Sequence, residues 1–373
     1  MSLAVIMQLK TGQRRGCRGN EAVERRLTSR PPPYVGGCRR LRRHGLVVFS
    51  LITVAAAASA PVALSGRAMG TGWSVKFIQP TPALDLDAVA RRVAERLEAL
   101  EQQFSTYRPD SELSRFNARV GTDWFAVAPE VAHVAAESRR VSELTGGAFD
   151  VTVDPLVRLW GFGPQRHTGA LPAETDIVRA RARVGWRQLE ACLDPPALRK
   201  TQPGIAADFS SMAKGFAADA VGDVLASLGA PNHLVQVGGD VKTSGGGEAG
   251  AGWRTGIERP LDDARAIADV VVLSGQALST SGDYRNFFTA EGRRYGHIID
   301  PRTGRPAASA LASVSVVHAS GATASALATG LFVLGPEEGF RLALAHRLAC
   351  LFLIRDGAGF TRRATPEFET LRR

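Results

Sequence analysis

Cysteine is scarce in this chain, whose 373 residues contain four. Cys17 and Cys38 precede residue 60, and the remainder holds Cys192 and Cys350, each in an apolar, strand-like context. Neither of the latter two has a second cysteine or a histidine at metal-ligand spacing, which excludes a disulfide scaffold and a cysteine-ligated zinc site. We expect two buried free thiols, with one disulfide between them as the alternative.

A net charge of one sign is also missing once the first sixty residues are set aside. The chain carries 46 basic and 36 acidic residues, but 11 of the basic and only two of the acidic ones lie in residues 1–60. The remainder, with 35 basic and 34 acidic residues, is close to neutral. We therefore predict no nucleic-acid partner, since such a partner needs a concentrated positive surface.

A long apolar run is absent too, and the best candidate lies near the start of the chain. Residues 39–44 are mostly basic, residues 46–58 are uncharged and apolar, and the small residues Ala56, Ala57 and Ala58 suit a signal-peptidase site. The run is short for a transmembrane helix, although a few more residues would let it span if it were left uncleaved.

This pattern divides the chain into two parts. Residues 1–60 are predicted to be an N-terminal extension with a signal peptide, for which an uncleaved membrane anchor is the alternative. Residues 61–373 are predicted to be one exported domain, either periplasmic or anchored to the inner membrane on its periplasmic side. Any association with the membrane would be through the N-terminal segment only.

Helical and strand-like patterns are interleaved along the second part. Amphipathic spacing predicts helices at 84–104, 129–144, 175–184, 211–229, 323–333 and 336–347. Apolar or alternating runs predict strands at 185–192, 195–201, 234–237, 252–259, 266–273, 314–317 and 350–354. Because several strands form hairpins, the pattern indicates an α+β fold, a mixed β-sheet core with packed helices, rather than a doubly wound sheet. Residues 279–285 are expected to form a polar turn, and the chain after residue 359 to be peripheral.

Residues 208–219 combine residue types that suit a phosphate and a metal ion. They start with an acid, Asp208, and apolar residues then recur at helical spacing around Lys214 in the first turn. Ser210 or Ser211 is placed to cap the helix, which leaves its first N–H groups facing whatever lies in front. A helix N-terminus beside a lysine suits a phosphate, and a nearby acid suits a metal ion. An ordinary capped helix with a solvated lysine is the alternative.

Further short motifs accompany this segment in a fixed order. They are Met69-Gly-Thr71, Phe104-Ser-x-Tyr107, Gly147-Ala-Phe-Asp150, Asp208-x-x-Ser-x-Ala-Lys214-Gly, Val237-Gly-Gly-Asp240, Ser281-Gly-Asp283, His297-Ile-x-Asp300-Pro-x-Thr-Gly304 and the helical segment 324–335. Together they resemble the ApbE-like family, the FAD:protein FMN transferases. The resemblance covers roughly residues 67–355 and implies an ApbE-like (T-fold-like) α+β domain.

The resemblance implies a specific reaction. Such enzymes bind FAD with Mg²⁺ and transfer its FMN half to a threonine or serine hydroxyl of a target protein, so that a phosphoester forms and AMP leaves. The implied partner is an exported flavoprotein, such as a subunit of a sodium-pumping NADH:quinone reductase or of an Rnf-type complex. An exported acceptor agrees with the predicted signal peptide.

The resemblance also implies roles for individual residues. The residues expected to line the FAD site are Met69, Tyr107, Ala148, Phe149, Asp150, Asp208, Lys214 and Ile298. The expected Mg²⁺ ligands are Ser211, Ser325 and Thr329, the last two on one helix face because they are four residues apart. His297 is the candidate proton acceptor for the incoming hydroxyl, with Asp300 as its orienter or an alternative base. A purely structural hydrogen bond is the other interpretation of His297.

One position departs from the family's pattern. The closing helix of the family normally carries an aspartate where this chain has Ser325, and a neutral hydroxyl is a poorer Mg²⁺ ligand than a carboxylate. The nearest acids in sequence that could supply the charge are Asp283 and Asp300. Two alternatives to transfer follow from this departure: an FAD-binding protein that transfers nothing, or an FAD pyrophosphatase that uses water in place of the acceptor hydroxyl.

Overall fold

The computed structural model describes residues 60–163, 171–261, 266–357 and 359–372. The predicted extension, with its signal peptide, cleavage site and alternative membrane anchor, lies outside the described residues except for Ala60, and its boundary at residue 60 stays a prediction. Within the ranges described, no helix has both the length and the apolar character needed to cross a membrane. Cys192 and Cys350 are free thiols, as expected, although Cys192 is only half-buried.

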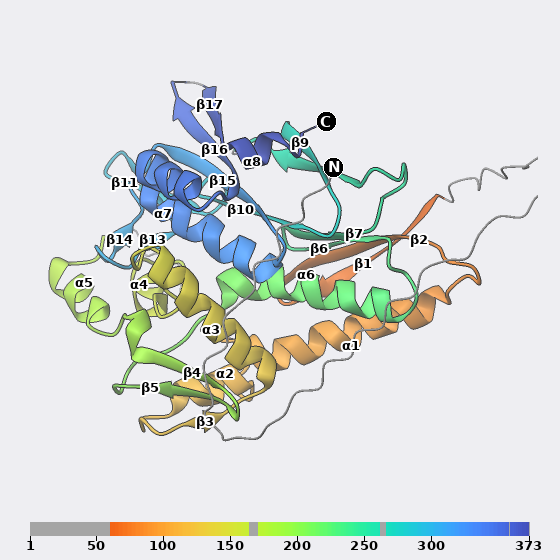
Figure 1. The fold of residues 1–373 in the computed structure, drawn as a ribbon. Coiled ribbons are helices and arrows are strands. Elements are labelled where there is room, and N and C mark those ends of the chain that lie inside the picture. Colours follow the sequence, from red (N-terminus) through yellow and green to blue (C-terminus); the bar gives the residue numbers. More distant parts are fainter. Residues whose placement is uncertain (1–59, 164–170, 262–265, 358, 373) are drawn as a thin grey trace, which may run out of the picture. The chain divides into compact units, whose positions relative to one another are not determined.

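The centre of the fold is a large antiparallel sheet (Figure 1). Its strands, in spatial order, are β1 (Pro61–Ala68), β2 (Thr71–Ile78), β6 (His233–Val237), β7 (Asp240–Ser244), β10 (Ala277–Gly282), β15 (Leu311–His318), β16 (Ala349–Asp356) and β17 (Gly359–Ala364). Every ladder between them is antiparallel. The predicted α+β class is confirmed, and the main sheet is antiparallel throughout rather than mixed.

Four long helices lie on one side of this sheet. They are α1 (Leu86–Phe104), α3 (Pro129–Leu144), α6 (Ser210–Ser227) and α7 (Gly321–Ala345). α6 and α7 are packed against the sheet, and α3 is packed on these two helices. α1 buries an apolar stripe at helical spacing, while α6 and α7 are apolar on most sides and lie deep in the main hydrophobic core. Figure 1 shows α6 between α1 and α7, and both neighbours contact it. α6 is therefore the central helix of this layer.

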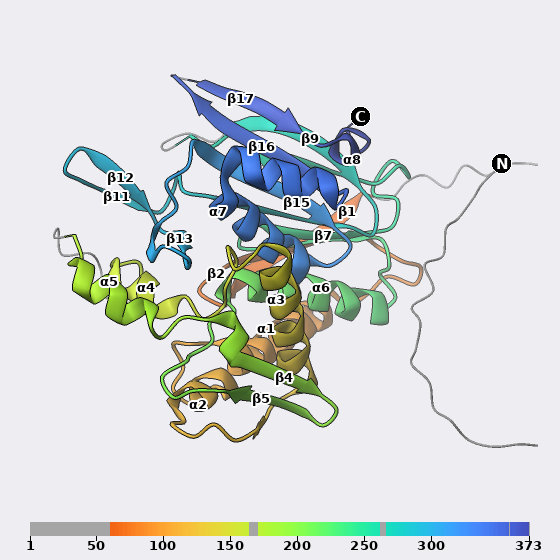
Figure 2. The ribbon, with the colours of Figure 1, turned by 60° about the vertical axis from the view of Figure 1, so that its left-hand side comes forward.

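Smaller elements surround this core. They are α2 (Glu112–Ala118), α4 (Asp154–Leu159), α5 (Glu174–Arg181), a 3₁₀ turn (Trp186–Gln188), the three-stranded sheet β3 (Phe125–Ala126), β5 (Pro196–Lys200) and β4 (Leu189–Leu193), and the hairpin pairs β8 (Trp253–Glu258) with β9 (Ile267–Leu273), β11 (Phe287–Ala290) with β12 (Arg293–Gly296), and β13 (Ile299–Asp300) with β14 (Arg305–Pro306). α4, α5 and the β11–β12 hairpin lie on the same side of the molecule (Figure 2) and share a small hydrophobic cluster. This cluster supports one wall of the cavity described below.

α6 and α7 cross at two glycines whose backbones touch. A Cβ atom added to Gly215 of α6 would lie 2.2 Å from the carbonyl oxygen of Gly321 in α7, and one added to Gly321 would lie 2.4 Å from that of Gly215. Any side chain at either position would force the helices apart. The first turn of α6 is thereby held against the first turns of α7.

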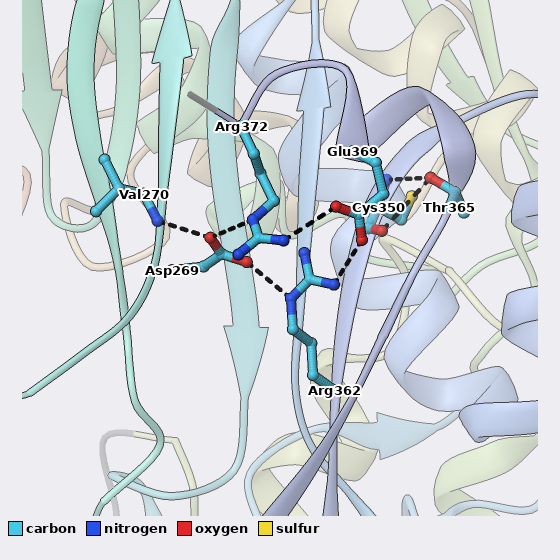
Figure 3. Close-up of polar contacts among 7 residues, drawn as sticks. All are labelled: Asp269, Val270, Cys350, Arg362, Thr365, Glu369 and Arg372. Carbon is cyan, nitrogen blue, oxygen red and sulfur yellow. Dashed lines mark hydrogen bonds and ion pairs between the residues drawn. The ribbon is translucent and has the colours of Figure 1, made fainter.

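The opposite face of the main sheet is covered by the end of the chain. α8 (Pro366–Glu369) and the β8–β9 hairpin bury a second hydrophobic cluster that includes Phe368. Asp269 of β9 accepts hydrogen bonds from Arg362 of β17 and from Arg372, and both arginines also pair with Glu369 (Figure 3). The expectation that the chain after residue 359 is peripheral is therefore wrong, because this segment closes a core.

One further sequence-based expectation is confirmed and another needs correction. The predicted helices 323–333 and 336–347 are the two helical parts of α7, separated by a kink where Gly335 adopts a non-helical, positive φ of 83° before Pro336. The predicted polar turn at 279–285 is largely strand β10, because its polar side chains alternate on a strand that pairs with β15. The segment is hydrophilic because polar side chains of this strand, such as that of Ser281, line a cavity, and its composition therefore suggested a turn.

The helix crossing gives a first prediction. Gly215→Ala should lower the free energy of unfolding by about 3 kcal/mol, since the added methyl group overlaps a backbone that cannot move without separating two buried helices. Chemical denaturation measures this. Gly72→Ala is the matched control, because a Cβ there meets no atom closer than 3.9 Å. Equal stability of the two variants would contradict the close crossing.

The C-terminal ion pairs give a second prediction. Asp269→Ala should lower the free energy of unfolding by about 2 kcal/mol. It removes a carboxylate with 4% exposure that pairs with two guanidinium groups, those of Arg362 and Arg372. The control is Glu337→Ala, which removes a carboxylate with 81% exposure that also pairs with an arginine of β17. Its loss should cost no more than about 1 kcal/mol. A control that destabilises as much as Asp269→Ala would refute the special role of Asp269.

Candidate active site

A cavity of about 410 Å³ opens at the N-terminal end of α6. It is lined by residues from α6, α7, β10, the loop after α3 and the segment around His297. The lining residues that the sequence predicted are Tyr107, Ala148, Phe149, Asp150, Asp208, Ser211, Lys214, His297, Ile298, Ser325 and Thr329. The cavity thus brings together residues that are up to 222 positions apart in the chain, and Met69 and Asp300 are the two predicted residues outside its lining.

The N-terminus of α6 is capped differently from the sequence-based expectation. The first residue before the helix is Phe209, and neither Ser210 nor Ser211 caps it with its side chain. Instead the carboxylate of Asp208 accepts a hydrogen bond of 2.8 Å from the N–H of Ser210. Partial burial raises the pKa of Asp208, although this hydrogen bond and Lys214 act in the opposite direction. The hydroxyl of Ser211 is consequently left free to line the cavity.

Lys214 supplies positive charge to the cavity from the first turn of α6. Its Nζ donates a hydrogen bond of 3.0 Å to the carbonyl oxygen of Ser210, so the ammonium group stays near the helix N-terminus. Gly238, in the turn between β6 and β7, has a φ of 68°, and a Cβ there would lie 2.7 Å from Cδ of Lys214. The first glycine of the Val237-Gly-Gly-Asp240 motif therefore leaves room for the lysine side chain.

A row of hydroxyl groups lines the same cavity as Lys214. Thr329 Oγ1 donates to the carbonyl oxygen of Ser325 at 3.1 Å and accepts from Ser281 of β10 at 3.0 Å. Ser325 Oγ donates to Asp240 Oδ2 at 3.4 Å. The predicted pair on one face of the closing helix does face the same cavity as Ser211.

Asp150 fixes the loop that forms another wall. Its two carboxylate oxygens accept from the N–H and hydroxyl of Thr152, at 2.7 and 2.6 Å, and from the N–H of Trp186 at 2.9 Å. Burial raises its pKa, and these hydrogen bonds oppose the shift. The carboxylate is thus occupied by the protein itself, while the neighbouring Ala148 and Phe149 line the cavity.

His297 is held as a neutral acceptor. Burial lowers the pKa of its imidazole. Its Nδ1 lies 3.2 Å from the carbonyl oxygen of Asn286, and since a carbonyl only accepts, Nδ1 carries the proton and Nε2 is left as an acceptor. The edge of the Phe162 ring packs against it, with centroids 6.3 Å apart.

Asp300 does not contact His297. Its carboxylate accepts two hydrogen bonds from the guanidinium group of Arg302, at 3.0 and 2.9 Å, and one from the N–H of Arg302. The carbonyl of Asn286, and not Asp300, forms the hydrogen bond that orients the imidazole of His297. The carboxylate of Asp300 is instead bonded to Arg302 in the turn that follows it. Met69 lies in the β1–β2 turn, where its N–H donates to Glu101. Tyr107 borders the cavity with 74% exposure.

Several lining residues had no role in the sequence-based prediction. These are Thr106, Val153, Asp154, Val157, Arg158, Phe162, Gly163, Ser210, Asp240, Thr280, Ser281, Gly282, Ile299 and Pro301. Asp240 and Ser281 stood inside recognised motifs, so the motifs themselves were the available signal. Asp154 and Arg158 form an i,i+4 ion pair of 2.6 Å on α4, a spacing visible in the sequence.

The comparisons with known proteins agree with this geometry. A model of the ApbE family matches residues 69–352. An FAD:protein FMN transferase of Vibrio cholerae is 39% identical over 330 residues, covering 88% of this chain and 98% of that protein. The chain belongs to the ApbE family. Another FAD:protein FMN transferase, from Escherichia coli, is 35% identical over 312 residues, covering 82% of this chain and 88% of that protein. The predicted enzyme class is a transferase, and both of these relatives are named as transferases.

Solved structures of ApbE proteins share the fold. The flavin transferase ApbE from Vibrio cholerae superposes with a TM-score of 0.77 at 38% identity, covering 84% of this chain and 99% of that one. The ApbE protein of Thermotoga maritima gives 0.74 at 26% identity, with 84% and 99% coverage. Both likenesses extend over most of the described domain.

The oxygen ligands available in the cavity fit a Mg²⁺ ion that is also coordinated by phosphate oxygens. No group of three or more histidine, cysteine, aspartate or glutamate side chains within the described part of the chain could hold a metal alone. Ser211, Ser325 and Thr329 offer neutral oxygens, and the buried Asp240 adds a carboxylate. Mg²⁺ is often bound by one or two carboxylates together with substrate phosphates, so the single carboxylate of Asp240 beside the phosphates of FAD would meet this requirement.

Proposed function

We propose that the chain transfers FMN from FAD to a threonine or serine hydroxyl of a target protein in a Mg²⁺-dependent reaction that releases AMP. The observation that carries the proposal is the convergence of Lys214, the hydroxyls of α7 and a neutral His297 on one cavity. The names of its relatives, FAD:protein FMN transferases, supply the substrate class.

The proposed transfer step is an attack of the acceptor hydroxyl on a phosphorus atom of FAD. The acceptor hydroxyl oxygen forms a bond to the phosphorus of the FMN half while the phosphoanhydride bond breaks, and AMP takes the bonding electrons. The hydroxyl proton passes to Nε2 of His297, the nitrogen left free by Asn286. Lys214 offsets the negative charge of the phosphates, and the N-terminus of α6 adds its partial positive charge.

A bound Mg²⁺ ion would polarise the phosphate oxygens and stabilise the charge that accumulates on AMP. Ser211, Ser325, Thr329 and Asp240 would hold it. The apolar and aromatic wall, which includes Phe149 and Ile298, suits the flat rings of FAD.

The proposed partner is an exported flavoprotein, and the proposed location of the enzyme is the periplasm or the periplasmic side of the inner membrane. Support for the location comes from the basic and apolar pattern at residues 39–58. A subunit of a sodium-pumping NADH:quinone reductase or of an Rnf-type complex is the acceptor to test first.

The direct test is flavin transfer by the purified full-length chain. It is incubated with FAD, Mg²⁺ and an acceptor domain, and covalent flavin is then detected by fluorescence on a denaturing gel. We expect a fluorescent acceptor band and one AMP per flavin attached. Lys214→Ala should slow transfer by about 100-fold, the effect of losing one preorganised charge donor.

The matched control is Lys76→Ala, which removes an exposed lysine of β2 away from the cavity. AMP release without acceptor labelling would support the pyrophosphatase alternative and reject transfer. FAD binding with neither product would leave the non-transferring alternative.

His297 gives a prediction on pH. Because burial lowers its pKa, the imidazole stays neutral below its ordinary pKa of about 6.5 and is protonated only in more acidic solution. The transfer rate should therefore stay flat from pH 8 to below about 6.5 and fall only in more acidic solution. His297→Gln should lose about 100-fold or more in rate, together with this acid limb.

The control for the pH profile is His346→Gln, at the exposed end of α7. It should leave both the rate and the acid limb unchanged. An acid limb that persists in the residual activity of His297→Gln would assign the titration to another group and refute the role of His297 as proton acceptor.

A further inference from the structure

Four carboxylates line the cavity, and three of them are already engaged. Asp150 accepts three hydrogen bonds from Thr152 and Trp186. Asp154 pairs with Arg158 at 2.6 Å. Asp208 accepts the N–H that begins α6. The fourth, Asp240, stands first in β7, directly after the turn that makes room for Lys214.

Asp240 is buried and has no ion-pair partner, although the positive charge of Lys214, which lines the same cavity, acts on it. Only 5% of the residue is exposed, and within the described ranges its carboxylate forms no ion pair. Its carboxylate accepts a hydrogen bond from a neutral hydroxyl, Ser325 Oγ at 3.4 Å, which is long for a hydrogen bond. A carboxylate removed from water needs strong donors or a cation in contact with it, and within the described ranges neither this hydroxyl nor Lys214, which forms no ion pair with it, supplies that contact.

The acids that the sequence suggested are not available for this purpose. Asp283 forms an ion pair with Arg355, and Asp300 forms one with Arg302. Neither lines the cavity. The expectation that one of them compensates for Ser325 is therefore not supported by the structure, whereas Asp240 lies at the hydroxyl of Ser325 itself.

We propose that Asp240 is the carboxylate ligand of the divalent cation in this chain, and that Ser325 is accommodated because the negative charge comes from β7 instead of α7. The proposal rests on the proposed Mg²⁺-dependent function. The cation would lie among Asp240, the hydroxyls of Ser325 and Thr329, and the phosphates of FAD. One carboxylate with several neutral and phosphate oxygens is an ordinary Mg²⁺ environment.

The test measures cation binding rather than turnover. Mn²⁺, a paramagnetic substitute for Mg²⁺, is titrated into the full-length chain with FAD bound and no acceptor, and free Mn²⁺ is followed by electron paramagnetic resonance. Asp240→Asn should weaken Mn²⁺ binding by at least about tenfold, since even outer-shell partners of a metal are commonly worth that much. FAD binding without a cation should stay the same or tighten, because a negative charge near the phosphates is removed.

A double variant separates a ligand from a structural residue. Asp240→Asn combined with Ser325→Asp returns one carboxylate to the same place from α7, and should regain most of the lost Mn²⁺ affinity. Asp223→Asn makes the same change in net charge on an exposed position of α6 and should leave Mn²⁺ affinity unchanged. Asp240→Ser, smaller and neutral, repeats the test if the asparagine variant does not fold.

The outcomes distinguish this proposal from the proposed function. Parent-like Mn²⁺ affinity in Asp240→Asn would overturn the assignment, as would a parent chain that binds no cation when FAD is bound. A parent chain that binds Mn²⁺ through Asp240 but labels no acceptor would leave the assignment standing and refute the transferase. Flavin transfer that needs no cation would support the transferase but reject its proposed Mg²⁺ dependence, and with it the reason for a cation ligand at Asp240.

Discussion

The contact between the backbones of Gly215 and Gly321 is the constraint on which the site depends. Lys214 precedes the first of these glycines, and Ser325 lies one turn after the second, so the crossing sets the distance between the positive charge and the hydroxyl row. A pair of helices separated by ordinary side chains would lie farther apart, since interaxial distances depend on the residues at the contact. Close packing here determines both the stability of the core and the geometry of the chemistry.

Charge in the cavity is arranged by what each carboxylate already contacts. Asp150 accepts hydrogen bonds from Thr152 and from the N–H of Trp186, and Asp208 accepts one from the N–H of Ser210, so both carboxylates fix the backbone around the cavity. The carboxylate of Asp240 accepts from the hydroxyl of Ser325 and forms no ion pair within the described ranges. Residues of one type thus take different roles because their hydrogen-bond partners differ, and composition alone does not distinguish them.

Local patterns gave most of the elements and motifs correctly. The predicted helix at 129–144 has the same bounds as α3, because its signals lie within its own residues. Contacts between distant segments could not be foreseen. Asp240 and Ser325 are 85 residues apart, and Asp269 and Arg372 are 103 apart. Which strands become neighbours depends on the whole sheet, so the sequence revealed neither the partner of Ser325 nor the role of the C-terminal segment.

Because several separate elements form the cavity, ligand binding also affects the stability of the folded protein. Its walls come from the loop after α3, the start of α6, β7, β10 and α7, which separate when the domain unfolds. A ligand that spans these walls therefore acts as a removable cross-link and binds only the folded chain. At a concentration 100 times its dissociation constant it would add about 2.7 kcal/mol to stability. The steady-state amount of this protein should accordingly follow the flavin supply of its compartment.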